Sequence, residues 1–188
     1  MQEEIFEFGL IVGRFQHIHI GHEKLINIGL KLCKKLLVFI GSANQEPSAR
    51  NPYAYEYRKS LIETIYKDEV KNGKLVIAPL NDWEDSSVLS PKWGEYVLES
   101  AREVLGKKPN CIIYGKDKDI FKCFAKETVK NLSEVYVDRN SLLISATKMR
   151  GFLMDDNKQE WMKYSNEKIH NKYDELKYKL EQVNKIDM

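Results

Sequence analysis

The segment FGLIVGRFQHIHIGH, residues 8–22, joins a run of apolar residues to a polar loop that contains three histidines. The run Phe8–Val12 predicts a short buried strand that ends at Gly13. We expect a helix to begin near His19–His22, where unpaired backbone NH groups attract anions. Gly13 lets a ligand approach the backbone closely, because it has no side chain. The segment therefore predicts a phosphate-binding loop between a strand and a helix.

The side chains of this loop suit the same kind of ligand. His19 and His22 are three residues apart, so both lie on one face of the first helical turn and can donate hydrogen bonds to phosphate oxygens. Arg14 adds a fixed positive charge and several donors. A single histidine is usually only a polar residue near the surface. Three of the chain's four histidines, however, fall within six residues directly after the expected strand, and chance explains this clustering less well.

Strand and helix patterns alternate along the chain. Apolar runs predict strands at 8–12, 36–40, 75–78, 111–114 and 134–137, and helical spacing predicts helices at 23–35, 54–70, 93–105 and 120–131. Buried strands joined through helices form a parallel sheet that is covered on both faces. The expected fold class is therefore α/β, a doubly wound, Rossmann-like parallel sheet of about five strands. Ligands of such sheets bind at the carboxyl ends of the strands, where Gly13, Gly41 and Gly115 fall.

The character of the sequence changes after Ala146. A short helix is expected at 147–154, and one or two amphipathic helices are expected at 158–183. We expect a main domain at residues 1–155 and, at residues 156–188, a C-terminal helical extension packed on it. The alternative is that this extension packs against the same extension of a second copy of the chain, which would give a homo-oligomer. Fewer than about three heptads make a coiled coil the weaker interpretation.

Composition and charge exclude several classes of function. The chain has 30 Lys and Arg against 28 Asp and Glu, a formal net charge of +2, so no overall field attracts nucleic acid or a membrane surface. The first ten residues are acidic where a signal peptide is basic, and no apolar run reaches the roughly 18 residues that span a bilayer. Three widely spaced cysteines argue against a disulfide framework or a zinc site. We therefore expect a cytoplasmic protein that binds neither nucleic acid nor a membrane.

Two motifs resemble the signatures of the nucleotidyltransferase superfamily. HIGH at residues 19–22 matches the HxGH signature, and ISATKMR at residues 144–150 matches ISxTxxR about 120 residues later. In physical terms, Ser145 and Thr147 suit the N-cap and first turn of a helix, where hydroxyl and NH groups meet oxyanions. Arg150 lies one turn further and can reach the same phosphates. Without the HxGH motif, an ordinary capped surface helix would be the simpler interpretation.

The residues before the HxGH motif resemble one branch of this superfamily. GRFQ at residues 13–16 is similar to the GRFQPxHxGH loop of archaeal-type nicotinamide mononucleotide adenylyltransferases and their bacterial relatives. Pantetheine-phosphate adenylyltransferases typically show GSFDP or GTFDP at this place, and cytidylyltransferases typically show GTFD. His17 stands where proline is usual, which concerns the rigidity of the loop rather than its phosphate chemistry. The resemblance covers roughly residues 8–155, so the main domain would be a nucleotidyltransferase domain.

The resemblance implies a reaction and a set of site residues. The 5′-phosphate of nicotinamide mononucleotide would attack the α-phosphorus of ATP, so that NAD forms and pyrophosphate leaves. The attacking group is already an anion, so catalysis needs positioning and charge stabilisation rather than a general base. The implied catalytic residues are Arg14, His19, His22, Thr147 and Arg150; the implied ATP-binding residues are Gly13, Phe15, His19, His22, Gly115, Asp117, Ser145, Thr147 and Arg150; and the implied acceptor-binding residues are Arg50, Asp82 and Trp93. Magnesium would enter with ATP and would be held by substrate and water, with no protein metal ligand.

Several alternatives stay open at this point. Trp93 could be a plain core residue, and Arg50 could be a solvated loop residue. Nicotinate mononucleotide is not separated from nicotinamide mononucleotide as the acceptor, whereas phosphopantetheine and cytidylyl acceptors fit the GRFQ prefix and Trp93 less well. A rival of another class is a non-catalytic nucleotide-sensing domain. Intact His19, His22 and Arg150 disfavour it, because a sensor does not need donors for a transition state.

Overall fold

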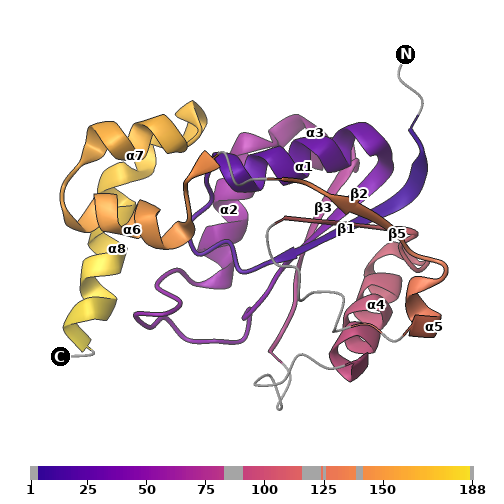
Figure 1. Cartoon of the computed structure of the whole chain (residues 1–188). Helices are drawn as coiled ribbons and strands as arrows, with labels where there is room; N and C mark the ends of the chain where they lie inside the picture. Colours follow the sequence, from indigo (N-terminus) through magenta and orange to yellow (C-terminus); the bar gives the residue numbers. More distant parts are fainter. Residues whose placement is uncertain (1–3, 83–90, 116–123, 125, 139–141, 187–188) are drawn as a thin grey trace.

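A parallel sheet lies at the centre of the computed structural model, which describes residues 4–82, 91–115, 124, 126–138 and 142–186 (Figure 1). Its five strands run in the order β3-β2-β1-β4-β5, and every neighbouring pair is parallel. The strands are β1 (Phe6–Gly13), β2 (Cys33–Ile40), β3 (Leu75–Pro79), β4 (Cys111–Tyr114) and β5 (Ser133–Tyr136). The expected doubly wound α/β fold is thereby confirmed.

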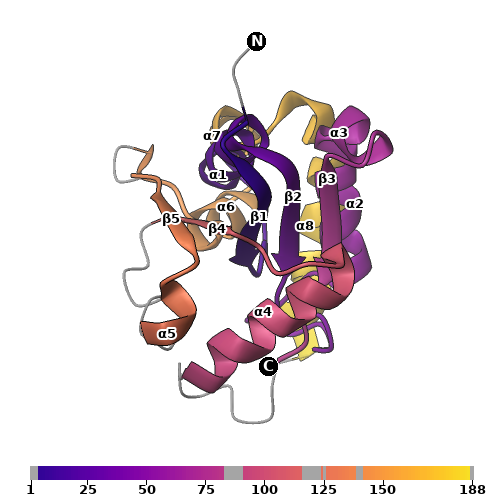
Figure 2. The same cartoon turned by 90° about the vertical axis from the view of Figure 1, so that its right-hand side faces the viewer.

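Helices cover both faces of this sheet (Figure 1, Figure 2). They are α1 (Ile20–Leu32), α2 (Tyr55–Ile65), α3 (Lys67–Lys71), α4 (Pro91–Leu105), α5 (Lys126–Val129), α6 (Ala146–Met154), α7 (Lys158–Tyr164) and α8 (Tyr173–Ile186), with the 3-10 helix η3 (Glu167–Lys172) before α8. Of the helix expected at 120–131, residues 120–123 and 125 lie outside the described residues, and α5 falls within the remainder. Within the described ranges, no helix has both the length and the hydropathy to cross a bilayer.

Two expected helices end earlier than their apolar spacing predicts. α1 stops at Leu32 and β2 begins at Cys33, so the prediction of a helix to Lys35 was wrong. Cys33 has an extended backbone and is fully buried in the sheet, so sheet pairing takes precedence over helical periodicity there. The helix expected at 54–70 is interrupted at Tyr66, where φ is −112° and ψ is 39°. The hydroxyl of Tyr66 donates a hydrogen bond to α1, which ties this interruption to the neighbouring helix.

Alternate residues of the central strands face opposite helical layers, as the pleat of a strand requires. Leu10, Leu37 and Phe39 belong to a hydrophobic cluster with residues of α4. Ile11 and Val38 belong to a larger cluster with residues of α1, α2 and the C-terminal helices. All five side chains are at most 1% exposed. Burial on both faces explains why these strands read as continuous apolar runs rather than as an alternating pattern.

The apolar side chains of the C-terminal segment belong to the larger cluster. Its buried members there are Trp161, Ile169, Tyr173, Leu176, Leu180 and Val183. The hydroxyl of Tyr53, which precedes α2, donates a hydrogen bond to the carbonyl oxygen of Leu176 at 3.2 Å. Side chains from both sides of the expected boundary at residues 155 and 156 therefore pack together, and the boundary itself stays a prediction.

Gly29 allows α1 to approach the sheet closely. A Cβ atom added at Gly29 would lie 2.8 Å from both δ-carbons of Leu36 on β2 and 2.9 Å from Cδ1 of Ile113 on β4. Both neighbours are at most 1% exposed, so they have little room to move. We expect Gly29→Ala to lower the free energy of unfolding by about 1–3 kcal/mol, because the core becomes overpacked. Urea-induced unfolding measures this change.

Gly151 provides a matched control for the same substitution. It also lies inside a helix, α6, but nothing lies within 4 Å of a Cβ atom added there. Gly151→Ala should therefore leave stability unchanged or raise it by up to about 1 kcal/mol through helix propensity alone. Equal effects of the two substitutions would contradict the close packing of α1 on the sheet.

Candidate active site

The phosphate loop, residues 13–19, lies where the order of the strands reverses. β1 has β2 on one side and β4 on the other, and the connections through α1 and α4 cover opposite faces of the sheet. In doubly wound sheets this is the place where ligands bind. The backbone NH of Gly41, just after β2, donates a hydrogen bond to the carbonyl oxygen of Gly13 at 2.9 Å. The ends of β1 and β2 are therefore held together at the mouth of the site.

The two strand ends are each followed by a residue that has a left-handed backbone although it is not glycine. The angle φ is 51° at Phe15 and 49° at Ser42. Such a conformation costs of order 1–3 kcal/mol and persists only where the surrounding structure imposes it. Phe15 is 2% exposed, and a Cβ atom added at Gly13 would lie 3.0 Å from Cε2 of its ring. Phe15 therefore forms part of the floor of the loop, beneath Gly13.

Arg58 of α2 holds both strained segments. Its guanidinium donates hydrogen bonds to the carbonyl oxygens of Arg14 at 2.6 Å, of Gly41 at 2.7 Å and of Ser42 at 3.0 Å. The Arg58 side chain is 1% exposed. Burial, and secondarily the charge of Arg14, lowers the pKa of Arg58 to about 10, so the group still carries its charge at neutral pH. A buried cation thus fixes the backbone at the ends of two strands.

Arg58 was not among the site residues predicted from the sequence. A signal was nevertheless present, because Arg58 shares the buried face of α2 with Leu61, Ile62 and Ile65. An arginine at an apolar position of an amphipathic helix needs buried acceptors, since unpaired buried charges are costly. The identity of those acceptors depends on loops from other parts of the chain.

Gln16 and Arg150 hold the middle of the phosphate loop. Gln16 is 3% exposed, and its amide donates to the carbonyl oxygen of Tyr53 at 3.2 Å and accepts from the backbone NH of Tyr53 at 3.0 Å. Arg150 of α6 donates to the carbonyl oxygen of Gln16 at 3.1 Å. Burial is the main cause that lowers the pKa of Arg150. The loop is therefore bonded to the segment before α2 and to α6.

A first cavity of about 230 Å³ lies between the phosphate loop, α1, the end of β4 and the start of α6. It is lined by Ile11, Val12, Gly13, Arg14, Phe15, Gln16, His22, Leu25, Ile113, Tyr114, Gly115, Ala146, Thr147 and Arg150. His22 of the first motif and Thr147 and Arg150 of the second motif thus border one cavity, as their predicted roles require. Asp117, which was also predicted to bind ATP, lies outside the described residues.

His19 and Ser145 cap helices in the structure. Nδ1 of His19 accepts a hydrogen bond from the backbone NH of Gly21 at 3.1 Å at the start of α1, and the His19 ring lies 4.0 Å from that of His22. Oγ of Ser145 accepts from the backbone NH of Lys148 at 3.2 Å at the start of α6. Neither residue is among those that line the two cavities. Direct contact of His19 and Ser145 with ATP stays a prediction.

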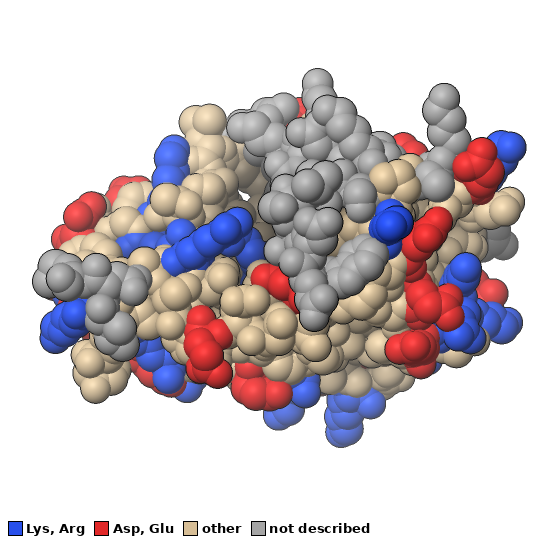
Figure 3. Space-filling view, turned by 90° about the horizontal axis from the view of Figure 1, so that it is seen from below, with Lys and Arg blue, Asp and Glu red and all other residues tan. Residues whose placement is uncertain are grey.

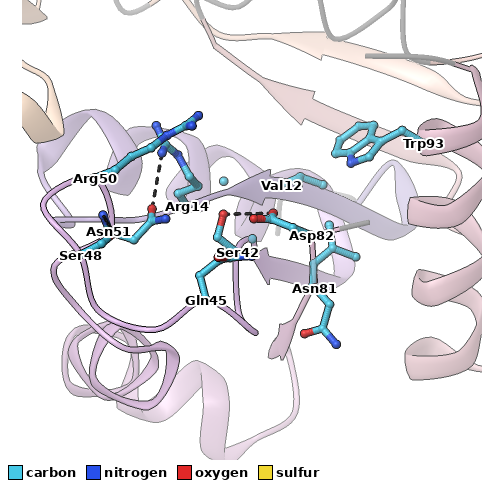
Figure 4. A pocket seen from close by; sticks show the side chains of 13 residues that line it. Val12, Arg14, Ser42, Gln45, Ser48, Arg50, Asn51, Asn81, Asp82 and Trp93 are labelled. Carbon is cyan, nitrogen blue, oxygen red and sulfur yellow. Dashed lines mark hydrogen bonds between the residues drawn. The ribbon is translucent and has the colours of Figure 1, made fainter. Parts of the chain in front are cut away.

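A second cavity of about 770 Å³ lies on the other side of β1 (Figure 4). It is lined by Val12, Gly13, Arg14, Gly41, Ser42, Gln45, Ser48, Arg50, Asn51, Leu80, Asn81, Asp82 and Trp93. The three residues predicted to bind the acceptor, Arg50, Asp82 and Trp93, therefore border one cavity. Trp93 also packs edge-to-face on Phe124, with ring centroids 6.4 Å apart, so it belongs to the core as well.

The polar groups of the second cavity are arranged along its length. Figure 4 shows Arg14 and Arg50 on one side, Trp93 on the opposite side and Asp82 between them. Arg14 donates to Oδ1 of Asn51 at 3.4 Å, and Oγ of Ser42 donates to Oδ1 of Asp82 at 3.0 Å. The cavity thus combines a cationic end with an aromatic end.

The two cavities meet at the end of β1, because Val12, Gly13 and Arg14 line both of them. A ligand in each cavity would therefore approach the other beside the phosphate loop. Charges on the face seen in Figure 3 are mixed, and Lys or Arg side chains border a hollow near its centre. The arrangement can bring two phosphorylated ligands together and neutralise the charge between them.

Comparison with known families gives one match that covers most of the chain. The chain matches the cytidylyltransferase-like family over residues 10–172. This range includes both motifs, both cavities and the first part of the C-terminal segment. It ends at the last residue of η3, before α8.

Several similar proteins are adenylyltransferases that act on pyridine mononucleotides. A nicotinamide-nucleotide adenylyltransferase of Archaeoglobus fulgidus is 26% identical over 163 residues, which cover 84% of this chain and 85% of that protein. A nicotinamide/nicotinic acid mononucleotide adenylyltransferase of Acinetobacter baylyi is 26% identical over 149 residues, 77% of this chain and 74% of that protein.

A solved structure of similar fold is that of a bifunctional NMN adenylyltransferase/ADP ribose pyrophosphatase from Francisella tularensis, complexed with AMP and a manganese ion. Its TM-score is 0.62 at 25% identity, and the match covers 80% of this chain. The match covers 42% of the Francisella protein, so this chain spans less than half of that bifunctional protein.

Proposed function

This chain belongs to the cytidylyltransferase-like family, and we propose that it is a nucleotidyltransferase that transfers the adenylyl group of ATP to nicotinamide mononucleotide, with NAD and pyrophosphate as products. The observation that carries this proposal is the pair of cavities that share Gly13 and Arg14. Adenylyl transfer needs two phosphorylated substrates whose phosphates meet at one point. The names of the Archaeoglobus and Acinetobacter relatives support the same reaction.

ATP is assigned to the first cavity. The start of α1, with the partial positive charge of a helix N-terminus, favours a triphosphate at this place. His22, Thr147 and Arg150 line the cavity and supply donors from two helices. These donors can stabilise the charge that develops on the α-phosphate and on the leaving pyrophosphate.

The acceptor is assigned to the second cavity. Nicotinamide mononucleotide has an anionic phosphate at one end and a positively charged pyridinium ring at the other. The phosphate suits the end with Arg14 and Arg50, where bidentate hydrogen bonds are available. The ring suits the face of Trp93, because aromatic faces attract cationic rings. Asp82 lies between these ends and adds a negative charge beside the pyridinium.

The reaction follows from this placement. A phosphate oxygen of the acceptor attacks the α-phosphorus of ATP, the bond between the α-phosphorus and the bridging oxygen breaks, and pyrophosphate leaves. Arg14 lines both cavities and therefore lies beside both reacting phosphates. The attacking oxygen is already anionic, so the site needs alignment and charge neutralisation rather than proton removal.

Magnesium accompanies ATP in such reactions. Among the residues that the structure describes, no group of three His, Cys, Asp or Glu side chains could hold a metal ion. Magnesium would be held by the phosphate oxygens of ATP and by water, and no step is assigned to it.

A transfer assay tests the proposal. The full chain is incubated with magnesium, either ATP or CTP, and one of three acceptors: nicotinamide mononucleotide, nicotinate mononucleotide or phosphopantetheine. Pyrophosphate release and the mass of the product are measured. We expect release and NAD with ATP and nicotinamide mononucleotide, and the ratio of the two mononucleotide rates decides which acceptor is preferred. Release with phosphopantetheine alone, or with CTP alone, would overturn the assignment, and no release with any pair would favour a nucleotide-sensing domain.

A further inference from the structure

His17 occupies the middle of the phosphate loop but lines neither cavity. It is fully buried, and both of its ring nitrogens are hydrogen-bonded. Nε2 of His17 lies 2.8 Å from the indole Nε1 of Trp161, and Nδ1 lies 2.5 Å from the carbonyl oxygen of Ile18. An indole NH can only donate, so Nε2 of His17 is the acceptor and the proton of the neutral ring is on Nδ1.

The neutral form of His17 is the stable form at neutral pH. Its pKa is lowered to about 4, chiefly by burial; the bond to Ile18 acts in the opposite direction, and the charge of Arg150 lowers the pKa again. The single tautomer and the buried position leave His17 unable to donate a proton to a ligand in either cavity. His17 therefore acts by accepting the hydrogen bond of Trp161 rather than by contacting a substrate.

Trp161 is a rigid partner for this histidine. It lies in α7, is fully buried and belongs to the larger hydrophobic cluster. Its ring packs on Tyr173 at 5.2 Å and on His170 at 5.7 Å between centroids, and it meets the His17 ring edge-to-face at 5.7 Å. The indole therefore has one orientation, with its NH aimed at the loop.

The loop needs such an anchor because its backbone is strained. Phe15, two residues before His17, has a left-handed backbone. Gln16, between them, receives the hydrogen bond from Arg150 of the first cavity. His19, two residues after His17, caps α1 beside His22. A shift of His17 would thus move Gln16 and His19 together, and with them the borders of the first cavity.

We propose that His17 and Trp161 form a positioning clamp through which α7 holds the phosphate loop in the conformation that binds the triphosphate. A proline at this position would restrict the backbone by itself; His17 instead restricts it through a hydrogen bond to the C-terminal segment. The clamp makes residues beyond 155 necessary for nucleotide binding, although none of them lines the first cavity. The proposal rests on the proposed function only in its choice of ATP as the ligand.

Trp161→Phe in the full chain tests the clamp. This substitution keeps an aromatic ring but removes the only donor of the indole, so Nε2 of His17 loses its partner. We expect the Kd for ATP with magnesium, measured by titration calorimetry, to rise about tenfold, and kcat to fall by a similar factor. The KM for nicotinamide mononucleotide should stay within about twofold, because the loop contributes only Gly13 and Arg14 to the second cavity and Arg58 holds the backbone of Arg14 independently of His17.

Tyr173→Phe is the matched control. It removes a hydroxyl that donates to Oδ1 of Asp156 at 3.1 Å, within the same cluster and in ring contact with Trp161, but it leaves the bond to His17 intact. We expect a smaller loss of stability than for Trp161→Phe, which also leaves a cavity in the core, and a Kd for ATP within about twofold of the parent value, because the bond between Trp161 and His17 remains. If both substitutions weaken ATP binding equally, the bond has only a structural role and the proposal is overturned.

Two further variants change the other partner. His17→Gln offers an amide oxygen as an acceptor near the position of Nε2, and we expect it to retain ATP binding within about threefold. His17→Leu should match Trp161→Phe, and the double variant should be no worse than either single variant, because one bond is lost in all three. Additive losses would overturn the clamp.

A measurement on the unchanged chain covers the case in which variants do not fold. A scalar coupling across the hydrogen bond between Nε1 of Trp161 and Nε2 of His17, seen by nitrogen NMR, should be present, and its absence would contradict the proposal. The ATP measurements need no acceptor. A failure of the transfer assay with nicotinamide mononucleotide therefore leaves the test of the clamp intact.

Discussion

His22→Ala is expected to lower kcat for adenylyl transfer by about 10²–10³-fold while the fold survives. His22 lies in the first turn of α1 and lines the first cavity, where the triphosphate of ATP is assigned. Its ring lies 4.8 Å from Phe15 and 4.0 Å from His19, between two buried rings that fix its orientation. A donor held in this way needs no reorganisation as charge develops, so its loss should appear mainly in kcat.

Steady-state kinetics with ATP as the varied substrate measure this effect. Lys31→Ala provides a control on the same helix, because Lys31 is exposed in the last turn of α1 and lines neither of the two cavities. Its kcat should equal that of the parent chain. Near-normal turnover of His22→Ala, with a folded protein by circular dichroism, would show that the phosphate role of His22 is wrong.

Arg58→Met is expected to lower the free energy of unfolding by about 3–5 kcal/mol. Methionine has a similar apolar length but leaves the carbonyl oxygens of Arg14, Gly41 and Ser42 without their charged donor. The strained backbone at Ser42 then loses the contact that holds it. We also expect transfer activity to fall in the fraction that still folds, because the ends of β1 and β2 border both cavities.

Denaturant unfolding of Arg58→Met and of Arg102→Met separates this role from the general loss of an arginine. Arg102 pairs with Glu99 on the exposed face of α4, so its replacement should change stability little. Arg58→Lys should fall between the two, because one ammonium cannot reach three carbonyl oxygens in the geometry of the guanidinium fork. If Arg58→Met proved as stable as Arg102→Met, the three bonds would contribute nothing measurable.

Local sequence predicted the elements of the site better than the contacts within them. The strand that ends at Gly13 and the helix that carries His22 follow from neighbouring residues, and both are present. His19 was predicted to bind phosphate from its spacing, and its capping bond to Gly21 adds a role that the HxGH pattern does not reveal. The spacing predicts which face of a turn a side chain occupies. It does not predict which of several partners the side chain takes.

Cys33 shows the same limit at the level of secondary structure. Helical spacing extended the helix to residue 35, whereas Cys33 begins β2. Its local pattern suits both a helix and a strand, because a short apolar run is ambiguous. Pairing with β1 decides between them, and this pairing depends on the whole sheet.

The doubly wound sheet, the loop that follows β1 and the two motifs could be predicted from the sequence. Apolar runs, glycines at strand ends and histidine spacing act over a few residues, so they can be read without a structure. Three features could be found only in the folded chain. Two cavities share Gly13 and Arg14, Arg58 donates to the backbone of Arg14 and Gly41, and Trp161 donates to His17 across 144 positions of the chain. The physical reason is that such contacts depend on the order of strands and the packing of distant helices. The polar groups of the loop therefore come from its own residues, whereas its conformation depends on hydrogen bonds from α2, α6 and α7.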